Sequence, residues 1–501
     1  MTAGGFTRRL RSGMALVPLL SLALPGLDVI AGVPGMPGGR MGAGQLEAQQ
    51  VPLDPDGRLP LDPAVRAGTL ENGLRSFVRQ NGRPEGRTEL RLVVNAGSIL
   101  EDEDQWGLAH FVEHMAFNGT ERFEKQALVD YLESIGMQFG PSINAYTSFD
   151  ETVYMLKIPT DDPEIVGTAF RILEDWAHAV SFEPGEVDKE RGVVLEEWRL
   201  GRGASARILD RQLPVILNDS RYADRLPIGD PEILRSFPVE ALTRFYGDWY
   251  RPDLMAVIAV GDFDPDGVED LIRSHFAGLE GPSEPRPRSE YEVPSHAETL
   301  FSIESDPEAT STSVAVLYKR PAEEDGGIEG YRDLLKERLY SGMFNGRLFE
   351  LGQSQDPPFA FAGAGAGRFA RDTDIYQIFA GVPDGGVPRG FEAVLTEAER
   401  IARHGFTPGE LAREQAELLR SMERMNAERN NRESASLASE LVSHFLTGEP
   451  APGVEAEYQL ATLLLPTITL EELNVEAAGW FGGQGDRVVT VSAPESVDVP
   501  L

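Results

Sequence analysis

Two patterns of apolar and polar positions recur along the chain. Residues 89–96 alternate, are rich in β-branched side chains and end at Gly97, which is typical of a half-buried strand. Residues 161–180 place apolar side chains three or four positions apart, which predicts a helix with one face in a core. Further strands are predicted at 142–146, 152–158 and 254–260, and further helices at 239–250 and 264–276. This mixture of elements indicates an α+β fold.

The same outline repeats in the second half of the chain. Residues 278–294 are rich in Pro, Glu, Ser and Arg, a composition typical of linkers. Beyond them the pattern predicts strands at 299–303, 311–319, 360–366, 374–382 and 487–493, and helices at 331–351, 391–404 and 408–447. We therefore expect two domains, 55–280 and 295–501, joined by a linker at 281–294.

Residues 1–50 are expected to lie outside both domains. Arg8, Arg9 and Arg11 form a basic start, and the apolar run 14–24 is too short to span a bilayer. A Gly/Pro/Met-rich stretch follows, so we interpret 1–50 as a signal peptide and a flexible spacer. This predicts export to the periplasm or cell envelope, without stable membrane insertion of the mature chain.

Composition limits the chemistry that is available. The chain has no cysteine, which excludes disulfides, thiolate metal sites and cysteine nucleophiles. The formal net charge of −35 disfavours binding to nucleic acid, so we expect no nucleic-acid partner. We interpret the acidity as surface solvation; the alternative is an acidic cavity that favours basic peptides.

The strongest chemical signal is the pentapeptide His110-Phe-Val-Glu113-His114. On a helix its two histidines project from one face, one turn apart, so both imidazoles can reach a single metal ion. Glu113 can then reach a water on that metal without being a ligand. The alternative is that these are ordinary surface or core histidines, although the chain has only 7 histidines in 501 residues.

A catalytic zinc needs a third protein ligand and an open position for water. A helix is predicted to begin near Pro184, about 80 residues downstream, since proline suits the first helical turn. Glu190 and Glu197 are seven positions apart and share a face of this helix. One can bind the metal while the other supports a histidine.

Three segments in this order resemble the pitrilysin/insulinase family of zinc peptidases, which carry the inverted H-x-x-E-H motif. They are residues 110–114, the Asn-Ala-Tyr-Thr-Ser at 144–148, and the Glu-Arg-x-Val-Val-x-x-Glu at 190–197. The amino-acid sequences of residues 114–120, 150–154 and 196–199 are most similar to those of the long bacterial, periplasmic-type zinc proteases of that family.

The resemblance implies one Zn²⁺ per chain, bound by His110, His114 and Glu197, with Glu113 as the general base. Glu190 matches the second acidic position of the family.

Glu196 is a competing ligand candidate. We prefer Glu197 because it matches the register of the family.

The resemblance also implies a fold and a mode of substrate binding. It predicts two duplicated domains, each an antiparallel-rich sheet covered by helices, which together form one half of a clam-shell chamber. Asn144 and Ala145 would lie on an edge strand to which an extended peptide adds through main-chain hydrogen bonds. The second domain would carry no metal, and no H-x-x-E-H recurs in it.

One departure affects the function. Active family members hold the substrate carbonyl with an arginine and a tyrosine in a segment resembling R-L-F-x-x-L-R-x-x-x-G-L-A-Y. Here residues 346–351 begin that pattern and residues 353–359 break it, and the resemblance covers only the first half of the long proteins. The partner is therefore expected to be a homodimer copy or a separate second-half chain.

Three functions follow as hypotheses. The first is a zinc metalloendopeptidase that cleaves unfolded peptides. The second is a metal-binding subunit that is inactive alone and needs a partner half that supplies the arginine–tyrosine pair. The third is a binding or structural protein that keeps zinc only for stability, which leaves Glu113 without a purpose.

Overall fold

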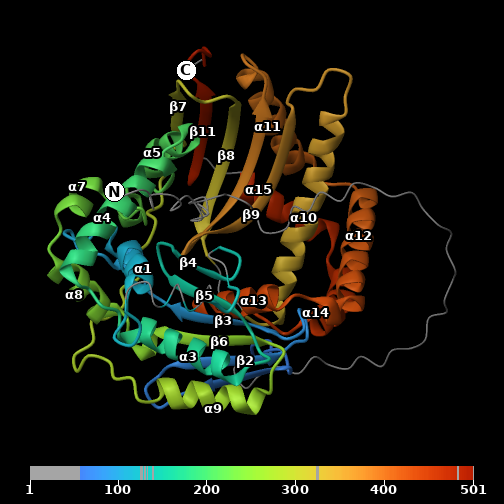
Figure 1. Ribbon diagram of the computed structural model, residues 1–501. Coiled ribbons are helices and arrows are strands. Elements are labelled where there is room, and N and C mark those ends of the chain that lie inside the picture. Colours follow the sequence, from blue (N-terminus) through green and yellow to red (C-terminus); the bar gives the residue numbers. More distant parts are fainter. Residues whose placement is uncertain are drawn as a thin grey trace, which may run out of the picture.

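The computed structural model contains two β-sheets, each covered by helices (Figure 1). It describes residues 57–124, 128, 131, 134–137, 140–322, 326–481 and 485–499. The α+β prediction is confirmed. The signal peptide and spacer predicted at 1–50 lie outside the described residues. Within the described residues, we find no helix that combines the length and the apolar character needed to cross a bilayer.

The first sheet has six strands in the order β1-β2-β6-β3-β5-β4. Only the β2–β6 pair is parallel. The short strand β4 follows the predicted segment closely and forms one edge of the sheet. The bounds are β1 (Val65–Thr69), β2 (Arg75–Gln80), β3 (Arg87–Val94), β4 (Ile143–Thr147), β5 (Thr152–Pro159) and β6 (Met255–Gly261).

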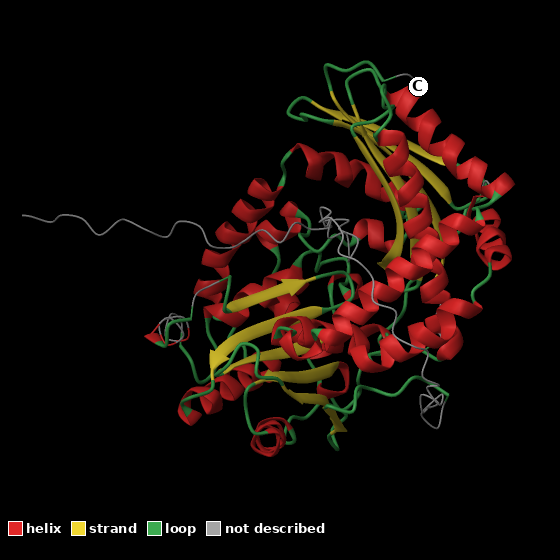
Figure 2. Ribbon diagram, turned by 90° about the vertical axis from the view of Figure 1, so that its right-hand side faces the viewer, coloured by secondary structure: helices red, strands yellow, loops and turns green. Residues whose placement is uncertain are grey.

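The helices of the first unit pack mainly on one face of this sheet. Figure 2 shows the two sheets as separate groups of strands with helices beside them. They are α1 (Leu108–Asn118), α3 (Pro163–His178), α4 (Pro184–Gly201), α5 (Ala204–Ile216), α6 (Arg221–Asp224), α7 (Pro231–Ser236), α8 (Val239–Trp249) and α9 (Pro265–Phe276), with 3-10 turns η1 (Ser98–Leu100) and η2 (Pro252–Leu254). Phe111 of α1 and Trp176 of α3 are fully buried against Leu92 of β3 in one apolar core. This burial fixes α1 to the sheet.

The second sheet repeats the first. Its order is β7-β11-β8-β10-β9, and its one parallel pair is β11 with β7. In the first sheet, β6 lies between its parallel neighbour β2 and its antiparallel neighbour β3. In the second sheet, β11 lies in the same way between β7 and β8. Strand β9 forms the edge of the second sheet that corresponds to β4 in the first. The bounds are β7 (Leu300–Asp306), β8 (Thr312–Pro321), β9 (Phe361–Ala370), β10 (Thr373–Val382) and β11 (Arg487–Pro494).

The helices of the second unit differ from the prediction at one place. They are α10 (Ile328–Gly352), α11 (Val387–His404), α12 (Pro408–Ala427), α13 (Ser434–Thr447), α14 (Val454–Leu464) and α15 (Leu470–Phe481), with 3-10 turns η3 (Arg429–Asn431) and η4 (Leu465–Thr467). The single helix predicted at 408–447 is wrong, because the chain breaks between α12 and α13. Helices α14 and α15 were not predicted.

The break coincides with contacts to a distant segment of the chain. Ser434 donates from both its backbone N–H (2.8 Å) and its hydroxyl (2.7 Å) to the carbonyl of Arg83, and Asn81 donates to the carbonyl of Arg432 at 3.0 Å. These bonds hold Glu433 in an extended conformation.

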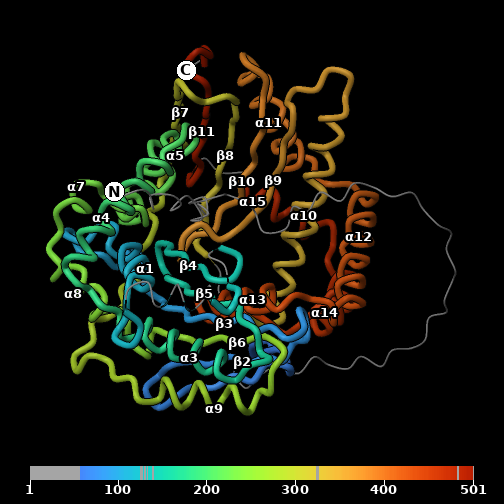
Figure 3. Tube along the Cα trace, viewed as in Figure 1, coloured from blue at the N-terminus to red at the C-terminus, as the bar shows by residue number. Residues whose placement is uncertain are grey.

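The break places α13 on the first sheet. Leu437 and Leu441 are buried with Val93 and Ile258, on the face opposite α1 (Figure 3). In the other direction α5 packs on the second sheet, where Gln212 donates to the carbonyl of Val491 at 3.1 Å. Each unit therefore contributes a helix to the other across the segment predicted as a linker.

Candidate metal centre

Helix α1 presents the H-x-x-E-H residues, and its start is built for close packing. Gly107, which precedes the helix, has a φ of 95°, and a Cβ on it would lie 2.8 Å from the Cα of Gly229. Glycine is therefore required there. The carboxylate of Glu101 accepts hydrogen bonds from the backbone N–H of Ala109 (2.8 Å) and of Gly107 (3.0 Å). It thus satisfies donors that the helix itself leaves free.

The segment 221–229, which had no predicted role beyond structure, braces this start. Arg225 donates to the carbonyl of Glu101 at 3.1 Å, and Arg221 donates to the carbonyl of Ile99 at 2.8 Å. Glu101 is fully buried, and burial raises its pKa to about 8 against the opposing effect of its two N–H donors. The sequence held one signal of this role, an acidic run directly before the predicted helix.

The structure brings His110, His114 and Glu197 together. One donor atom from each lies within 4.8 Å of the others. The Nε2 of His114 is 3.2 Å from Oε2 of Glu197, and the Nε2 of His110 is 3.9 Å from its Oε1. His114 Nε2 and Glu197 Oε2, which face each other, are both buried. A buried carboxylate that approaches the Nε2 atoms of two imidazoles is an arrangement that a metal ion can bridge.

Glu190 lies behind the group rather than in it. Its Oε1 is 2.8 Å from Nδ1 of His114, and its Oε2 accepts from Asn118 at 2.6 Å. Glu196 points elsewhere, since its side chain is 53% exposed and pairs with Arg199 on the same helix. The geometry places Glu197, and not Glu196, beside the histidines.

The group favours a cation. Burial opposes the charged form of His114, but hydrogen bonds to Glu190 and Glu197 outweigh it and raise its pKa to about 10. Burial and the charge of His114 lower the pKa of His110 to about 4, which keeps that imidazole neutral. Two imidazoles and one carboxylate are a donor set that suits zinc. These residues therefore fit a zinc ion, which would take the place of the proton on His114 Nε2.

Glu113 adjoins the group without joining it. The residue is 6% exposed, and burial raises the pKa of its carboxyl to about 7. One carboxylate oxygen accepts a hydrogen bond of 2.6 Å from the hydroxyl of Thr147 on β4. Thr147 was part of the predicted motif 144–148, but it was not singled out as a site residue.

Strand β4 presents alternate backbone groups at the free edge of the sheet. Ser148 donates to the carbonyl of Glu151, and Lys157 donates to that of Ser142, so the even-numbered residues of β4 pair with β5. Ala145 and Thr147 therefore direct their N–H and C=O outward. The Asn144 side chain accepts from the N–H of Ala145 at 3.0 Å. Of the two predicted substrate contacts, Ala145 offers main-chain groups and Asn144 offers its side chain.

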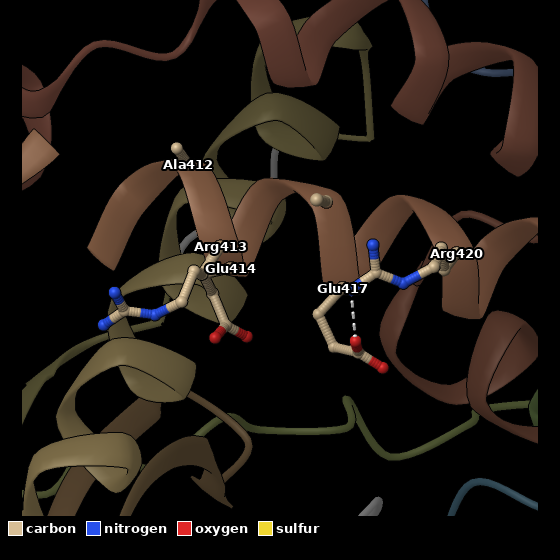
Figure 4. A pocket seen from close by; sticks show the side chains of 6 residues that line it. Ala412, Arg413, Glu414, Glu417 and Arg420 are labelled. Atoms are coloured by element: carbon tan, nitrogen blue, oxygen red, sulfur yellow. Dashed lines mark hydrogen bonds and ion pairs between the residues drawn. The ribbon is translucent and has the colours of Figure 1, made fainter. Parts of the chain in front are cut away.

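Two other features lie apart from this group. A hollow of about 440 Å³ runs along α12 and is lined by small and charged side chains of that helix (Figure 4). Arg347, in the segment that begins the substrate-binding pattern, is held by Glu410 at 2.6 Å and by Glu397 at 3.1 Å. Neither feature supplies a residue to the metal group.

Two family models match the chain. Residues 77–210 match the model described as "Insulinase (Peptidase family M16)", and residues 236–418 match "Peptidase M16 inactive domain". The first match contains all three candidate ligands, and the second begins in the first unit and ends in α12.

Two curated relatives of the chain are named as zinc proteases. The chain is 37% identical over 450 residues to "Zinc protease PQQL-like" of Arabidopsis thaliana, covering 89% of this chain and 44% of that protein. It is 32% identical over 419 residues to "Probable zinc protease PqqL" of Escherichia coli, covering 83% and 45%. The chain thus spans less than half the length of these relatives.

A solved structure matches more completely. The crystal structure of the first half of the periplasmic protease PqqL from Escherichia coli superposes with a TM-score of 0.82 at 30% identity. The match covers 87% of this chain and 93% of that one. The predicted resemblance is confirmed: the chain belongs to the insulinase family, peptidase family M16.

Proposed function

We propose that this chain is the metal-bearing part of a zinc metalloendopeptidase that hydrolyses peptide bonds in unfolded peptides. The observation that carries the proposal is the convergence of His110, His114 and Glu197 beside the buried carboxyl of Glu113. The zinc protease names of the relatives support the choice of metal and reaction. We propose one Zn²⁺ per chain, held by these three residues.

The role of each side chain follows from its contacts. Zinc bound here would act as a Lewis acid and lower the pKa of a water in its open position. Glu113 would accept a proton from the attacking water and deliver it to the leaving amine, for which a pKa near 7 is suited. Glu190 would keep the proton of His114 on Nδ1, so that the lone pair of Nε2 is free to bind the metal.

Substrate would bind as an added strand. The outward N–H and C=O groups of Ala145 and Thr147 would form hydrogen bonds with the backbone of the peptide, whatever the side chains of the peptide are. The side chain of Asn144, which accepts from the N–H of Ala145, would either leave that N–H free for the peptide or itself bind the peptide. Such pairing favours extended peptides over folded proteins.

A second candidate is a metal-binding chain that is inactive alone. Two observations favour it. The chain covers only 44–45% of the two relatives described above, and Arg347 is committed to Glu397 and Glu410. The missing substrate contacts would then come from a separate second-half chain, or from a second copy in a homodimer. The periplasmic protease among the similar structures supports export to the periplasm or cell envelope for either candidate.

One experiment tests both candidates. The purified chain is incubated with a mixed pool of unstructured peptides, its zinc content is measured, and Glu113→Gln is run beside it. Cleavage that depends on Glu113 supports the endopeptidase. Zinc at one per chain without cleavage supports the inactive subunit, and absence of zinc binding rejects the metal site.

A further inference from the structure

We propose that Thr147 is a positioning residue that holds the carboxylate of Glu113 in register with the substrate strand. The inference rests on the proposed function and adds a determinant of turnover to it. It starts from the 2.6 Å hydrogen bond from Thr147 Oγ1 to Glu113 Oε2. Within the described part of the chain, this is the one hydrogen bond found for that carboxylate.

The side chain and the backbone of Thr147 meet different parts of the molecule. Its side chain lies on the same face of β4 as Ile143 and Ala145, which pack in the core that contains α1. Its hydroxyl therefore meets a residue of the metal-binding helix. Tyr146 lies on the opposite face and packs against the α13 cluster.

The backbone of the same residue faces outward. Because Ser148 pairs with Glu151, Thr147 belongs to the set whose N–H and C=O point away from β5 at the free edge of the sheet. A peptide added there would take its register from this backbone. The general base would take its orientation from the hydroxyl a few bonds away.

Thr147 would thus orient the general base through its hydroxyl and the substrate strand through its backbone. A carboxylate with a free χ angle samples positions that differ by an ångström or more, and a misplacement of that size can cost about a hundredfold in rate. Threonine suits the role, since its β-branch fits a strand and restricts χ1, which fixes the direction of the hydroxyl.

The test compares Thr147→Val, which keeps the shape and removes the hydroxyl, with Thr147→Ser, which keeps the hydroxyl. Tyr146→Phe is the matched control, because it removes a hydroxyl from the opposite face of the same strand. Each variant is assayed for zinc per chain and for kcat and KM on an internally quenched unstructured peptide. We expect Thr147→Val to lower kcat about ten- to a hundredfold with zinc content and KM within twofold, and both other variants to stay within about threefold of the parent.

An unchanged kcat in Thr147→Val, or loss of zinc from it, overturns the proposal. A second readout does not need activity. Crystal structures of the zinc-loaded parent and Thr147→Val should show the Glu113 carboxylate at the Thr147 hydroxyl in the parent and in another rotamer in the variant. If the parent cleaves no peptide, the chain is not an endopeptidase on its own, and the two structures still decide: an unmoved carboxylate overturns the inference, and a moved one supports it.

Discussion

The imidazole of His114 on α1 lies against the carboxylate of Glu190 on α4, 76 residues away in sequence, with Nδ1 and Oε1 separated by 2.8 Å. This contact orients the ring so that Nε2 faces Glu197. Helix α4 has only two buried apolar residues, Val187 and Val194, among the residues described. Polar contacts therefore contribute much of the register between α4 and α1.

Loss of the charge on Glu190 should weaken metal binding. We expect Glu190→Gln to lower zinc affinity about ten- to a hundredfold, because the amide holds the Nδ1 proton less strongly. Competition with a chromogenic chelator measures this. Glu186→Gln is the control: it lies one turn earlier on α4 and pairs with Lys189 at 2.6 Å. Equal affinity of the two variants would contradict the supporting role of Glu190.

Two adjacent glutamates should behave in opposite ways. Glu197→Gln is expected to lose zinc on dialysis, since it removes the carboxylate that faces the Nε2 atoms of both histidines. Glu196→Gln is expected to retain one zinc per chain, because that side chain is exposed and paired with Arg199. Metal analysis of both proteins after gel filtration checks the assignment, which would be reversed by the opposite pattern.

Glu101 should make stability depend on pH. Its pKa in the folded chain, about 8, lies above the ordinary value of 4.5, so folding favours the protonated form. The stability that this proton supports is complete below pH 4.5 and is lost as pH rises through 8. The slope is at most about 1.4 kcal/mol per pH unit between these limits.

The measurement is the free energy of unfolding by urea between pH 5 and 9, with and without Glu101→Gln. The variant should lose part of this decline, at a cost of about 1 kcal/mol near pH 5, because an amide cannot accept from both N–H groups. Parallel curves for the two proteins would show that Glu101 does not titrate in this range.

The packing of α13 on the first sheet should be a large contribution to stability. Leu441 is 3% exposed among Val93 and Ile258, so Leu441→Ala is expected to lower the free energy of unfolding by about 2–5 kcal/mol. Leu463→Ala, at a position 44% exposed, should change it by less than about 0.5 kcal/mol. A small effect of Leu441→Ala would mean that the first unit does not need this helix.

The sequence by itself determined the local elements and the residue types of the site. The period of apolar positions predicted β3, β5, α3 and α8 closely, because one-sided burial imposes that period on strands and helices. The spacing of His110 and His114 placed both rings on one helix face, since that is a property of any α-helix. Spacing alone left three candidates for the metal-binding glutamate, namely Glu190, Glu196 and Glu197.

Tertiary structure places Glu197 beside both histidines and Glu196 at the surface. The sequence could not show this, because the side of α4 that meets α1 depends on packing between distant segments and leaves no periodic trace. Tertiary structure also decided the break before α13, which coincides with a hydrogen bond between Ser434 and Arg83, 351 residues apart. For the same reason the roles of Glu101 and Thr147 were not predicted: each acts through a contact with α1 that only the folded chain creates.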